Sequence, residues 1–476
     1  MTDTLEIDEN IRHSISDQQA WHYHIVPKEM SDAKWTLYIE DSYDTESVKE
    51  ELELTFNRSI QFEVVESEIL RKTLNRYYRI SDSEAQSLKT ISNSNANNFL
   101  NSLIKEAKEM HSSDIHIETY ENLCRVRFRI DGKLLEKYRI DKDNYPSLVN
   151  KIKIKSNIDI AEKRLPQDGR ILFNEDNLNF DIRVSVLPTL NGEKIVLRLL
   201  SKDSTNIEIS KLGFTPEQQS IFLENIKKTH GIILISGPTG SGKTTTLYAT
   251  LKILNKTESN ILTIEDPVEY TLSGINQVQL KEDIGLTFAR ALRTFLRQDP
   301  DIIMLGEIRD EETAQMAIRA ALTGHLVLST IHTNSSWGII TRLTDMGIPP
   351  FLLSDTVNLC VAQRLIRLLC PHCKEQCDFD SSLLPQTFKP VSLPKTYYKS
   401  KGCEHCYYTG YKGRKAIYEV LPVDSRLSEF IRTGKYDIEL FRKEMGILSL
   451  AESAFNDFVA GNTSIEEIYP ILLNNN

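Results

Sequence analysis

Gly231–Thr246 reads GIILISGPTGSGKTTT, a short apolar run followed by a loop rich in glycine and hydroxyl side chains. The loop, Gly237–Thr244, fits the pattern G-x-x-x-x-G-K-[ST], and a preceding apolar strand is the context that identifies a phosphate-binding loop. Glycines let backbone amides point at phosphate oxygens, and the following helix offers the positive end of its dipole. This stretch therefore predicts a parallel α/β domain that binds a nucleoside triphosphate.

Four short apolar runs have the length of buried parallel strands. They alternate with helical patterns between about residues 205 and 365, and they are Gly231–Ser236, Ile261–Ile264, Ile302–Leu305 and Leu326–Thr330. Continuous apolar runs of this kind are typical of a sheet that helices cover on both faces. Because ligands of such sheets bind beyond the carboxyl ends of the strands, polar residues directly after these runs are candidates for nucleotide chemistry.

The phosphate loop supplies the first set of candidate site residues. Lys243 is expected to bridge the β- and γ-phosphates, and Thr244 is expected to ligate Mg²⁺. The residues predicted to contact the nucleotide here are Gly237, Pro238, Thr239, Gly240, Ser241, Gly242, Lys243, Thr244 and Thr245.

Acidic side chains gather after two of the predicted strands: Glu307 after one, and Glu265, Asp266 and Glu269 after another. All four are candidates for the nucleotide site, since one acid near a magnesium nucleotide can orient or deprotonate the attacking water. Gly306 stands where a metal-binding aspartate is usual. The alternatives are an ion pair between Glu307 and Arg309, and solvated loop acids at the other three positions.

Histidines stand at both ends of the strand Leu326–Thr330. His325 precedes it and His332 follows it, which places them about 20 Å apart at about 3.3 Å per residue. Only His332 lies at the carboxyl end, so it is the candidate for sensing the γ-phosphate. His325 remains a candidate nucleotide-site residue, although its end of the strand predicts another surface, such as a subunit joint. A hydrogen-bonded core histidine is the alternative for both.

Three arginines, Arg290, Arg293 and Arg297, are spaced i, i+3 and i+7 before Asp299-Pro300. This spacing predicts one face of a helix. The face fits either a contact with a neighbouring subunit or a solvated, ion-paired surface.

Four of the seven cysteines form two pairs, Cys370-Pro371-His372-Cys373 and Cys403-Glu404-His405-Cys406. Two C-x-x-C pairs in a chain without a secretion signal indicate a metal site rather than disulfides. Cys370, Cys373, Cys403 and Cys406 suit tetrahedral Zn²⁺ and leave no open position, so the predicted site is structural. His372 and Cys377 are alternative ligands. The two remaining cysteines, Cys124 and Cys360, are expected in the core.

Two smaller domains are predicted upstream of the α/β domain. Residues 1–20 are acidic and polar, which predicts a disordered tail. Residues 21–82 predict a βαβα module, with strands Trp35–Glu40 and Ile60–Val65 and helices Thr45–Thr55 and Glu68–Tyr78. The stretch Ser81–Asn98, rich in Ser, Asn and Asp, is typical of a linker that leads into a helix.

Residues 83–204 predict an α+β domain with an antiparallel sheet. Its expected elements are the helix Asn97–Met110 and the strands Asp114–Glu118, Leu123–Ile130, Asp181–Val186 and Glu193–Leu200, with a hairpin turn at Asp131-Gly132. The α/β core then spans residues 205–365, the cysteine-bearing subdomain 366–412, and a helical C-terminal region 413–476.

The net charge of −10 is concentrated near the N-terminus. Residues 1–60 hold 14 Asp and Glu against 5 Lys and Arg, so the other 416 residues are nearly neutral. Because a nucleic-acid motor usually carries a basic surface, this balance argues against one. No apolar run reaches the length of about 18 residues that predicts a membrane span, and no secretion signal is recognisable. We expect a cytoplasmic protein that associates with a membrane only through a partner.

In these motifs the chain resembles the ATPases of type II secretion systems and of type IV pilus assembly over about residues 90–476. The matching segments are Gly237–Thr246, Ile264–Tyr270, Gly285–Asp310, Thr323–Asn334, Ala362–Leu365 and both cysteine pairs, with Ser112–Glu118, Gln167–Arg170 and Asp181–Pro188 in the preceding domain. The resemblance implies a RecA-like core that hydrolyses ATP, preceded by a PAS-like α+β domain, with ATP, Mg²⁺ and Zn²⁺ as cofactors.

The resemblance also implies roles for single residues. It places Glu269 at the general base, Glu307 at the acid of the Mg²⁺ site, and His332 beside the phosphates. Arg170 and Arg183 match arginines that reach the nucleotide from the preceding domain. Gly306 matches the family as well. A homo-hexameric ring at the cytoplasmic face of the bacterial inner membrane is implied, in which hydrolysis moves the preceding domain against the motor.

The branch of the family is inferred from two features. The cysteine pairs favour assembly or secretion motors over retraction motors. One N-terminal module without an Arg-Leu-Gly motif favours type II secretion, where the module docks on a membrane-anchored partner. A type IV pilus assembly motor is the alternative. A regulatory nucleotide-binding scaffold and a nucleic-acid motor are less favoured, and the presence of Lys243, Glu269 and Glu307 argues against the scaffold.

Overall fold

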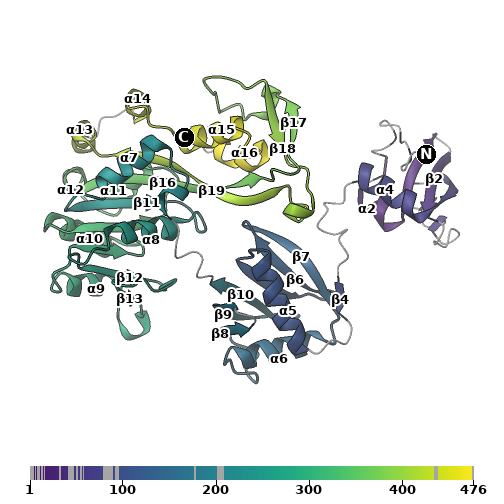
Figure 1. Ribbon diagram of the computed structural model, residues 1–476, viewed down its shortest axis with the longest axis horizontal. Helices are drawn as coiled ribbons and strands as arrows, with labels where there is room; N and C mark the ends of the chain where they lie inside the picture. The colour runs from purple at the N-terminus through teal and green to yellow at the C-terminus, as the bar shows by residue number, and fades with distance from the viewer. Residues whose placement is uncertain are drawn as a thin grey trace. The chain divides into compact units, whose positions relative to one another are not determined.

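The computed structural model describes residues 5, 7, 11, 14–15, 17–31, 34–40, 48–49, 52–53, 56, 58–78, 89–91, 96–175, 178–200, 208–433 and 438–473. The chain divides into two compact units. One comprises residues 1–93, 122–127 and 135–144, and the other comprises residues 94–121, 128–134 and 145–476. Figure 1 labels the elements along the chain.

The N-terminal module is a three-stranded sheet with helices packed on it. Its described elements are α2 (Asp17–His22), β1 (Ile25–Met30), β2 (Lys34–Glu40), β3 (Ser59–Val65) and α4 (Ser67–Tyr77). The central strand, β2, is antiparallel to β1 and parallel to β3. Alternate residues of β2, Leu37 and Ile39, are fully buried, as are Leu70 and Leu74 one turn apart on α4. The two periodicities therefore place one face of each element in the core.

The sequence prediction for this module missed β1. Pro27 lies within that strand, and a proline in an apolar run argues against a strand unless the strand is at an edge or a bulge. β1 is an edge strand with a register shift between Pro27 and Glu29. The predicted disordered tail also extends too far, because Ile15 is 2% exposed and α2 begins at Asp17. The predicted helix Thr45–Thr55 and linker Ser81–Asn98 lie largely outside the described residues.

The second sheet has seven strands in the order β4-β7-β6-β5-β10-β9-β8. Its elements are β4 (Lys89–Ile91), α5 (Ala96–Glu109), β5 (Asp114–Thr119), β6 (Cys124–Ile130), β7 (Lys133–Ile140), α6 (Tyr145–Lys155), β8 (Gln167–Glu175), β9 (Leu178–Thr189) and β10 (Gly192–Leu200). Strands β5, β10, β9 and β8 are antiparallel to their neighbours in that order. The predicted hairpin turn is confirmed between β6 and β7, where Asp131 and Gly132 have φ values of 47° and 87°.

The third sheet is the predicted α/β core, with strands in the order β13-β12-β14-β15-β11-β16-β19. Its strands before residue 370 are β11 (Gly231–Ser236), β12 (Ile261–Glu265), β13 (Asn276–Gln279), β14 (Ile302–Leu305), β15 (Leu326–Ile331) and β16 (Val357–Leu369). Its helices are η2 (Ile209–Lys211), α7 (Pro216–Asn225), α8 (Lys243–Leu254), η3 (Glu282–Ile284), α9 (Phe288–Phe295), α10 (Glu311–Leu322), α11 (Trp337–Asp345) and α12 (Pro350–Thr356). Along the sheet from β13 through β12, β14, β15 and β11 to β16, each strand is parallel to the next.

Helices cover both faces of this sheet, as the continuous apolar runs predicted. Ile232 and Leu234 of β11 belong to a core with α9, α10, α11 and α12. Ile233 and Ile235 belong to a second core with Phe222 of α7 and Leu247 of α8. Each central strand is therefore buried on both sides, which fixes the backbone at its carboxyl end.

The C-terminal part returns to the same sheet. Its elements are β17 (Glu375–Asp378), η4 (Ser381–Leu383), β18 (Thr396–Lys399), η5 (Glu404–Cys406), β19 (Tyr411–Pro422), α13 (Ser425–Thr433), α14 (Ile438–Glu444), α15 (Leu450–Val459) and α16 (Ile465–Leu473). β19 is antiparallel to β16, from Leu369 opposite Tyr411 to Leu359 opposite Pro422. The predicted domain boundaries at 365 and 413 are therefore wrong, because both fall inside strands of the core sheet.

Candidate nucleotide and metal sites

The phosphate loop joins β11 to α8 at the carboxyl edge of the core sheet. Gly237 and Gly242 have φ values of 152° and 87°, which are strained for residues with a side chain. A Cβ at Gly237 would also lie 2.5 Å from the carbonyl oxygen of Gln363. These glycines therefore give the loop a shape that presents backbone amides at the start of α8, as an anion site requires. Thr244 is exposed on the first turn of α8.

Lys243 lies within this loop, close to an acid. Its Nζ donates hydrogen bonds to the carbonyl oxygens of Gly237, at 2.7 Å, and Pro238, at 3.1 Å. Burial lowers the pKa of Lys243, the nearby carboxylate of Glu307 opposes this change, and Arg364 adds to it. The charge of Glu307 therefore acts on the residue predicted to bind phosphate.

Glu307 and His332 follow neighbouring strands, β14 and β15, and lie beside each other. Nε2 of His332 is 3.3 Å from Oε2 of Glu307, and Arg309 forms an ion pair with the other carboxylate oxygen. Arg309 is also 3.5 Å from Asp266. The ion pair between Glu307 and Arg309, which was the alternative for Glu307, is thus present. Because Arg309 contacts both Glu307 and Asp266, these two predicted site acids lie at the same sheet edge.

Gly306 has a steric reason to lack a side chain. Its amide donates to the carbonyl oxygen of Ile264 at 2.8 Å, and a Cβ would lie 3.3 Å from the backbone of Ile264 and Glu265. Close packing of β14 on β12 therefore favours glycine before Glu307.

Glu265 is enclosed rather than open to a ligand. The side chain is 3% exposed, and it accepts hydrogen bonds from Tyr248, from Thr263 at 2.6 Å and from Gln277 at 3.1 Å. Burial, together with Glu265, raises the pKa of Tyr248, so that its hydroxyl remains a donor. We expected this carboxylate at the nucleotide, whereas the structure uses it to join β12 to α8.

Gln363 and Arg364 support the phosphate loop from behind, a role that the sequence reasoning did not assign. The Gln363 amide donates to the carbonyl oxygen of Ser241 at 2.8 Å and accepts from Thr246 Oγ1 at 2.9 Å. Arg364 donates to the carbonyl oxygen of Asn334 at 3.1 Å. The signal for both was the segment Ala362–Leu365, which the family resemblance included.

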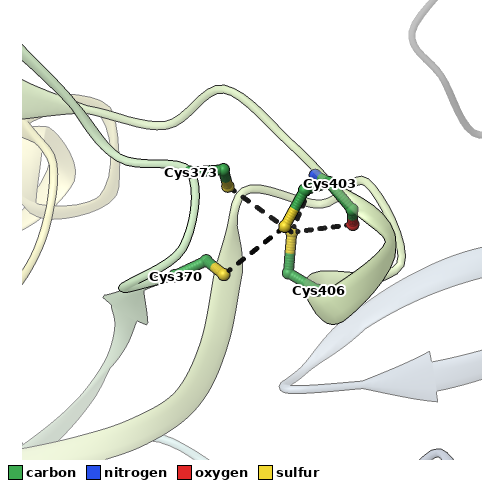
Figure 2. Close-up of side chains that lie close together, drawn as sticks. All are labelled: Cys370, Cys373, Cys403 and Cys406. Atoms are coloured by element: carbon green, nitrogen blue, oxygen red, sulfur yellow. Dashed lines mark hydrogen bonds between the residues drawn. The ribbon is translucent and has the colours of Figure 1, made fainter.

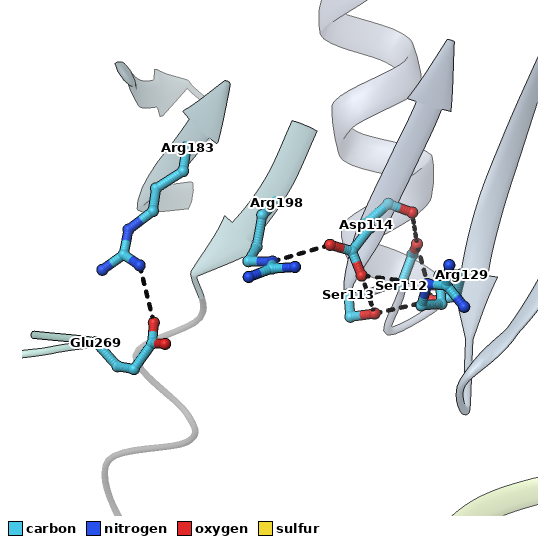
Figure 3. Close-up of polar contacts among 7 residues, drawn as sticks. All are labelled: Ser112, Ser113, Asp114, Arg129, Arg183, Arg198 and Glu269. Atoms are coloured by element: carbon cyan, nitrogen blue, oxygen red, sulfur yellow. Dashed lines mark hydrogen bonds and ion pairs between the residues drawn. The ribbon is translucent and has the colours of Figure 1, made fainter. Parts of the chain in front are cut away.

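Glu269, the expected general base, has an arginine partner from the second sheet. Nη1 of Arg183 is 3.1 Å from Oε2 of Glu269, and Nη2 donates to the carbonyl oxygen of Val268 at 2.6 Å (Figure 3). Both side chains are about one-third exposed, at 31% and 37%. An arginine of the preceding domain therefore contacts a predicted catalytic carboxylate directly.

Arg183 stands in a row of charged residues that crosses four strands. Arg170 of β8, Arg183 of β9, Arg198 of β10 and Asp114 of β5 lie opposite one another in register. Arg198 pairs with Asp114 at 3.0 Å, and Ser113 donates to the same carboxylate at 2.8 Å (Figure 3). The exposed Arg170 forms its ion pair with Asp181. Sequence reasoning missed Arg198, because only strand register reveals that it neighbours Arg183.

The remaining candidate side chains lie apart from this edge. His325 precedes β15, where its Nδ1 is 2.8 Å from the carbonyl oxygen of Ala320, at the other end of the strand from His332. Arg293 pairs with Glu312 at 2.5 Å, which fits the ion-paired surface. Arg297 lies beyond the end of α9, so the three arginines do not share one helix face.

The four paired cysteines form one cluster. Their sulfur atoms all lie within 4.8 Å of one another, and three of the separations are 3.8 Å (Figure 2). A tetrahedron of sulfur ligands at about 2.3 Å from a Zn²⁺ ion has edges of about 3.8 Å. The cluster therefore has the donor set and spacing of a closed tetrahedral metal site.

The alternative ligands lie outside this cluster. His372 and His405 lie with ring centroids 4.2 Å apart and planes tilted by 30°, and Cys377 contacts the carbonyl oxygen of Glu375 at 4.0 Å. Among the described residues, neither His372 nor Cys377 belongs to the metal-competent group. Cys124 and Cys360 are buried, as predicted.

Comparison with known proteins extends these observations to most of the chain. The sequence profile of a family described as "Type II/IV secretion system protein" matches residues 90–470. The chain belongs to this family. It is therefore a secretion ATPase that hydrolyses ATP.

Relatives from both branches are equally similar. The type II secretion system protein E of Pseudomonas aeruginosa is 46% identical over 371 residues, which cover 78% of this chain and 74% of that protein. The type II secretion system ATPase E of Vibrio cholerae is 46% identical with the same coverage. The type IV pilus assembly ATPase PilB of Myxococcus xanthus is 47% identical over 376 residues, 78% of this chain and 66% of that protein.

Solved structures share the fold. The Legionella pneumophila ATPase DotB aligns with a TM-score of 0.59 at 21% identity, covering 82% of this chain and 99% of that one. The pilus retraction motor PilT, solved with bound ADP, aligns with a TM-score of 0.53 at 27% identity, covering 77% and 95%. The expected RecA-like core with a preceding α+β domain is thus confirmed. Among the described helices, none is both long and apolar enough to span a membrane.

Proposed function

We propose that this chain powers protein export by a type II secretion system, as a ring-forming ATPase that drives assembly of a pseudopilus. One observation carries the proposal. Lys243, Glu307 and His332 lie around one edge of the core sheet, and Glu269 at the same edge contacts Arg183 of the preceding domain. The 46% identity to type II secretion proteins over 78% of the chain supports the branch.

The proposed hydrolysis assigns one task to each group. The amides of Gly237–Thr245 and the Lys243 ammonium hold the phosphates. Thr244 and Glu307 would hold Mg²⁺, which would neutralise charge on the phosphate oxygens when bound. Glu269 takes a proton from the attacking water, and His332 donates a hydrogen bond to the γ-phosphate.

Arg170 and Arg183 are proposed to approach the nucleotide from the preceding domain. Each now pairs with a carboxylate, Asp181 or Glu269, so each can exchange that partner for a phosphate oxygen. When Arg183 makes this exchange, Glu269 is released to act as a base. Binding of ATP is thereby linked to movement of the preceding domain.

The tetracysteine cluster is proposed to hold one structural Zn²⁺. Four sulfur donors at tetrahedral separations suit this ion and leave no position for a substrate.

The assembly is proposed to be a homo-hexamer at the cytoplasmic face of the inner membrane, with the N-terminal module docked on a membrane-anchored partner. Positions 1–60 hold 14 acidic and 5 basic residues, and this negative balance would suit a basic docking surface. Because the remaining residues are nearly neutral, nucleic acid is not proposed as a partner.

The test of the proposed chemistry is Glu269→Gln. We expect the variant to bind ATP as the wild type does, and to lose at least about a hundredfold in kcat, because the amide cannot accept the proton. Glu217→Gln, which changes an exposed acid on α7, is the matched control and should keep its turnover. Unchanged hydrolysis in Glu269→Gln would reject the general-base role.

A type IV pilus assembly motor is the second candidate, favoured by the 47% identity to PilB of Myxococcus xanthus. Deletion of the gene separates the two. Loss of protein export with intact pili is expected, whereas loss of pili with normal export would assign the chain to pilus assembly.

A further inference from the structure

Glu419 is a buried carboxylate that none of the roles above uses. It lies on β19 opposite Ala362 of β16. The residue after Ala362 is Gln363, which binds the phosphate loop. Its side chain is 3% exposed. Removing a carboxylate from water is unfavourable unless hydrogen bonds or charges replace the lost solvent. The buried carboxylate of Glu419 is therefore expected to have hydrogen-bond donors around it.

Glu419 accepts hydrogen bonds from residues at the starts of two helices. Oε1 accepts from the amide of Ser336 at 2.9 Å and from its hydroxyl, directly before α11. Oε2 accepts from the amide of Leu450 at 3.3 Å, the first residue of α15. Helix N-termini carry unpaired amides and a positive dipole end, both of which favour an anion. One carboxylate thus joins the starts of α11 and α15.

The segment His332–Ser336 runs from the end of β15 to this junction and lies along the phosphate loop. Arg364 donates to the carbonyl oxygen of Asn334 at 3.1 Å, and the hydroxyl of Ser236 donates to the carbonyl oxygen of Ser335 at 3.4 Å. Ser236 directly precedes the first glycine of the loop. The position of His332 beside Glu307 therefore depends on how the far end of this short segment is held.

We propose that Glu419 is a positioning residue of the ATPase site, which fixes the segment His332–Ser336 at the phosphate loop and links it to helix α15. The inference deepens the proposed function and rests on it. A shift of His332 on binding of the γ-phosphate is transmitted through Ser336 and Glu419 to the start of α15. The C-terminal helices thereby respond to the nucleotide.

The test compares two buried carboxylates. Glu419→Gln keeps the size of the side chain but turns a donor toward one of the two amides, so we expect kcat to fall by roughly tenfold to a hundredfold. We expect KM for ATP to stay within about threefold, because the loop contacts remain. Asp457→Asn is the control. Asp457 is 7% exposed on α15 and pairs with Lys415 at 2.7 Å instead of with Ser336 or Leu450, so kcat should stay within about twofold.

A second variant and a second readout keep the inference decidable. Ser336→Ala removes only the hydroxyl bond to Glu419, and it should lower kcat in the same direction by a smaller factor. If Glu419→Gln and Ser336→Ala both keep wild-type kcat, or if Asp457→Asn loses as much, the positioning role is overturned.

Hydrogen exchange separates this inference from the proposed function. A non-hydrolysable ATP analogue should slow amide exchange in the first turn of α15 in the wild type, and this effect should vanish in Glu419→Gln. If the wild type hydrolyses no ATP, the proposed function fails, yet the exchange measurement still decides the link. Equal protection in both proteins would overturn it.

Discussion

The nucleotide edge of the core sheet and the tetracysteine cluster are built on different principles. At the nucleotide edge, side chains follow strands that are buried on both faces, and charged groups have protein partners. Glu307 pairs with Arg309 and lies beside His332. In the cluster, the sulfur atoms lie mainly against one another on turns, and the segment around them exposes Val391 and Leu393.

This difference indicates which of the two regions would need a bound ligand to keep its structure. Central strands with apolar neighbours on both sides hold their ends in place without a nucleotide. The tetracysteine segment is loop-rich, and a metal held there, as proposed, would add to its stability, since metal binding and folding are coupled in such segments. We therefore expect changes at the nucleotide edge to alter turnover and changes at the cluster to alter structure.

The largest effect is expected for Cys370→Ser combined with Cys403→Ser. Two of four ligands are lost, and with them a binding free energy on the order of 10 kcal/mol. Elemental analysis should fall from about one Zn²⁺ per chain to none, and limited proteolysis should cut within residues 370–410. Cys377→Ser, which changes a sulfur outside the cluster, should keep the metal. A wild-type protein that contains no metal would contradict the proposed Zn²⁺ site.

An intermediate effect is expected for Arg183→Ala. Loss of the guanidinium proposed to reach the phosphates should lower kcat by about a hundredfold, the size typical of removing one charge-stabilising group. The melting temperature should change by less than about 2 °C, because the ion pair is partly exposed. Arg170→Ala, whose partner is Asp181, should lower kcat less. A large loss of stability in Arg183→Ala would show that the nucleotide edge also depends on its contacts for folding.

The smallest effect is expected for Tyr248→Phe. The change removes a buried hydrogen bond to the Glu265 carboxylate, which should cost about 1.5 to 3 kcal/mol of the free energy of unfolding. Turnover should fall by less than about threefold, because Thr263 and Gln277 still hold Glu265. Denaturant unfolding measures the first quantity, with Tyr469→Phe on α16 as an exposed control. Strongly reduced turnover at unchanged stability would place Glu265 in the chemistry instead.

The sequence predicted features whose signals are local. The phosphate loop, the four apolar strands, the Asp131-Gly132 turn and the cysteine pairs each depend on residues within a few positions of one another. Features that depend on distant partners were missed. β19 pairs with β16 across the cysteine-bearing segment, and β1 is a proline-containing edge strand. Arg198 becomes a neighbour of Arg183 only through strand register.

Burial of acids was equally hidden from the sequence. Glu265 and Glu419 are both 3% exposed, although acids are usually at the surface. Each is stabilised by hydrogen bonds from helices or strands distant in sequence, such as those from Tyr248 and Leu450. No spacing rule in one chain shows which carboxylate will find such partners.

The pairing of Leu369 with Tyr411 has a further consequence for the history of the fold. The amide of Cys370 also bonds to the carbonyl oxygen of Gly410 at 2.9 Å, so residues 370–410 enter and leave the sheet at one point. The whole segment is an excursion from the tip of a β-hairpin. Such an insertion can be gained or lost in a single genetic event, with a tight turn in its place, while the register of β16 and β19 is preserved. The tetracysteine segment is therefore separable from the core sheet: its gain or loss leaves the strands that carry the nucleotide site unchanged.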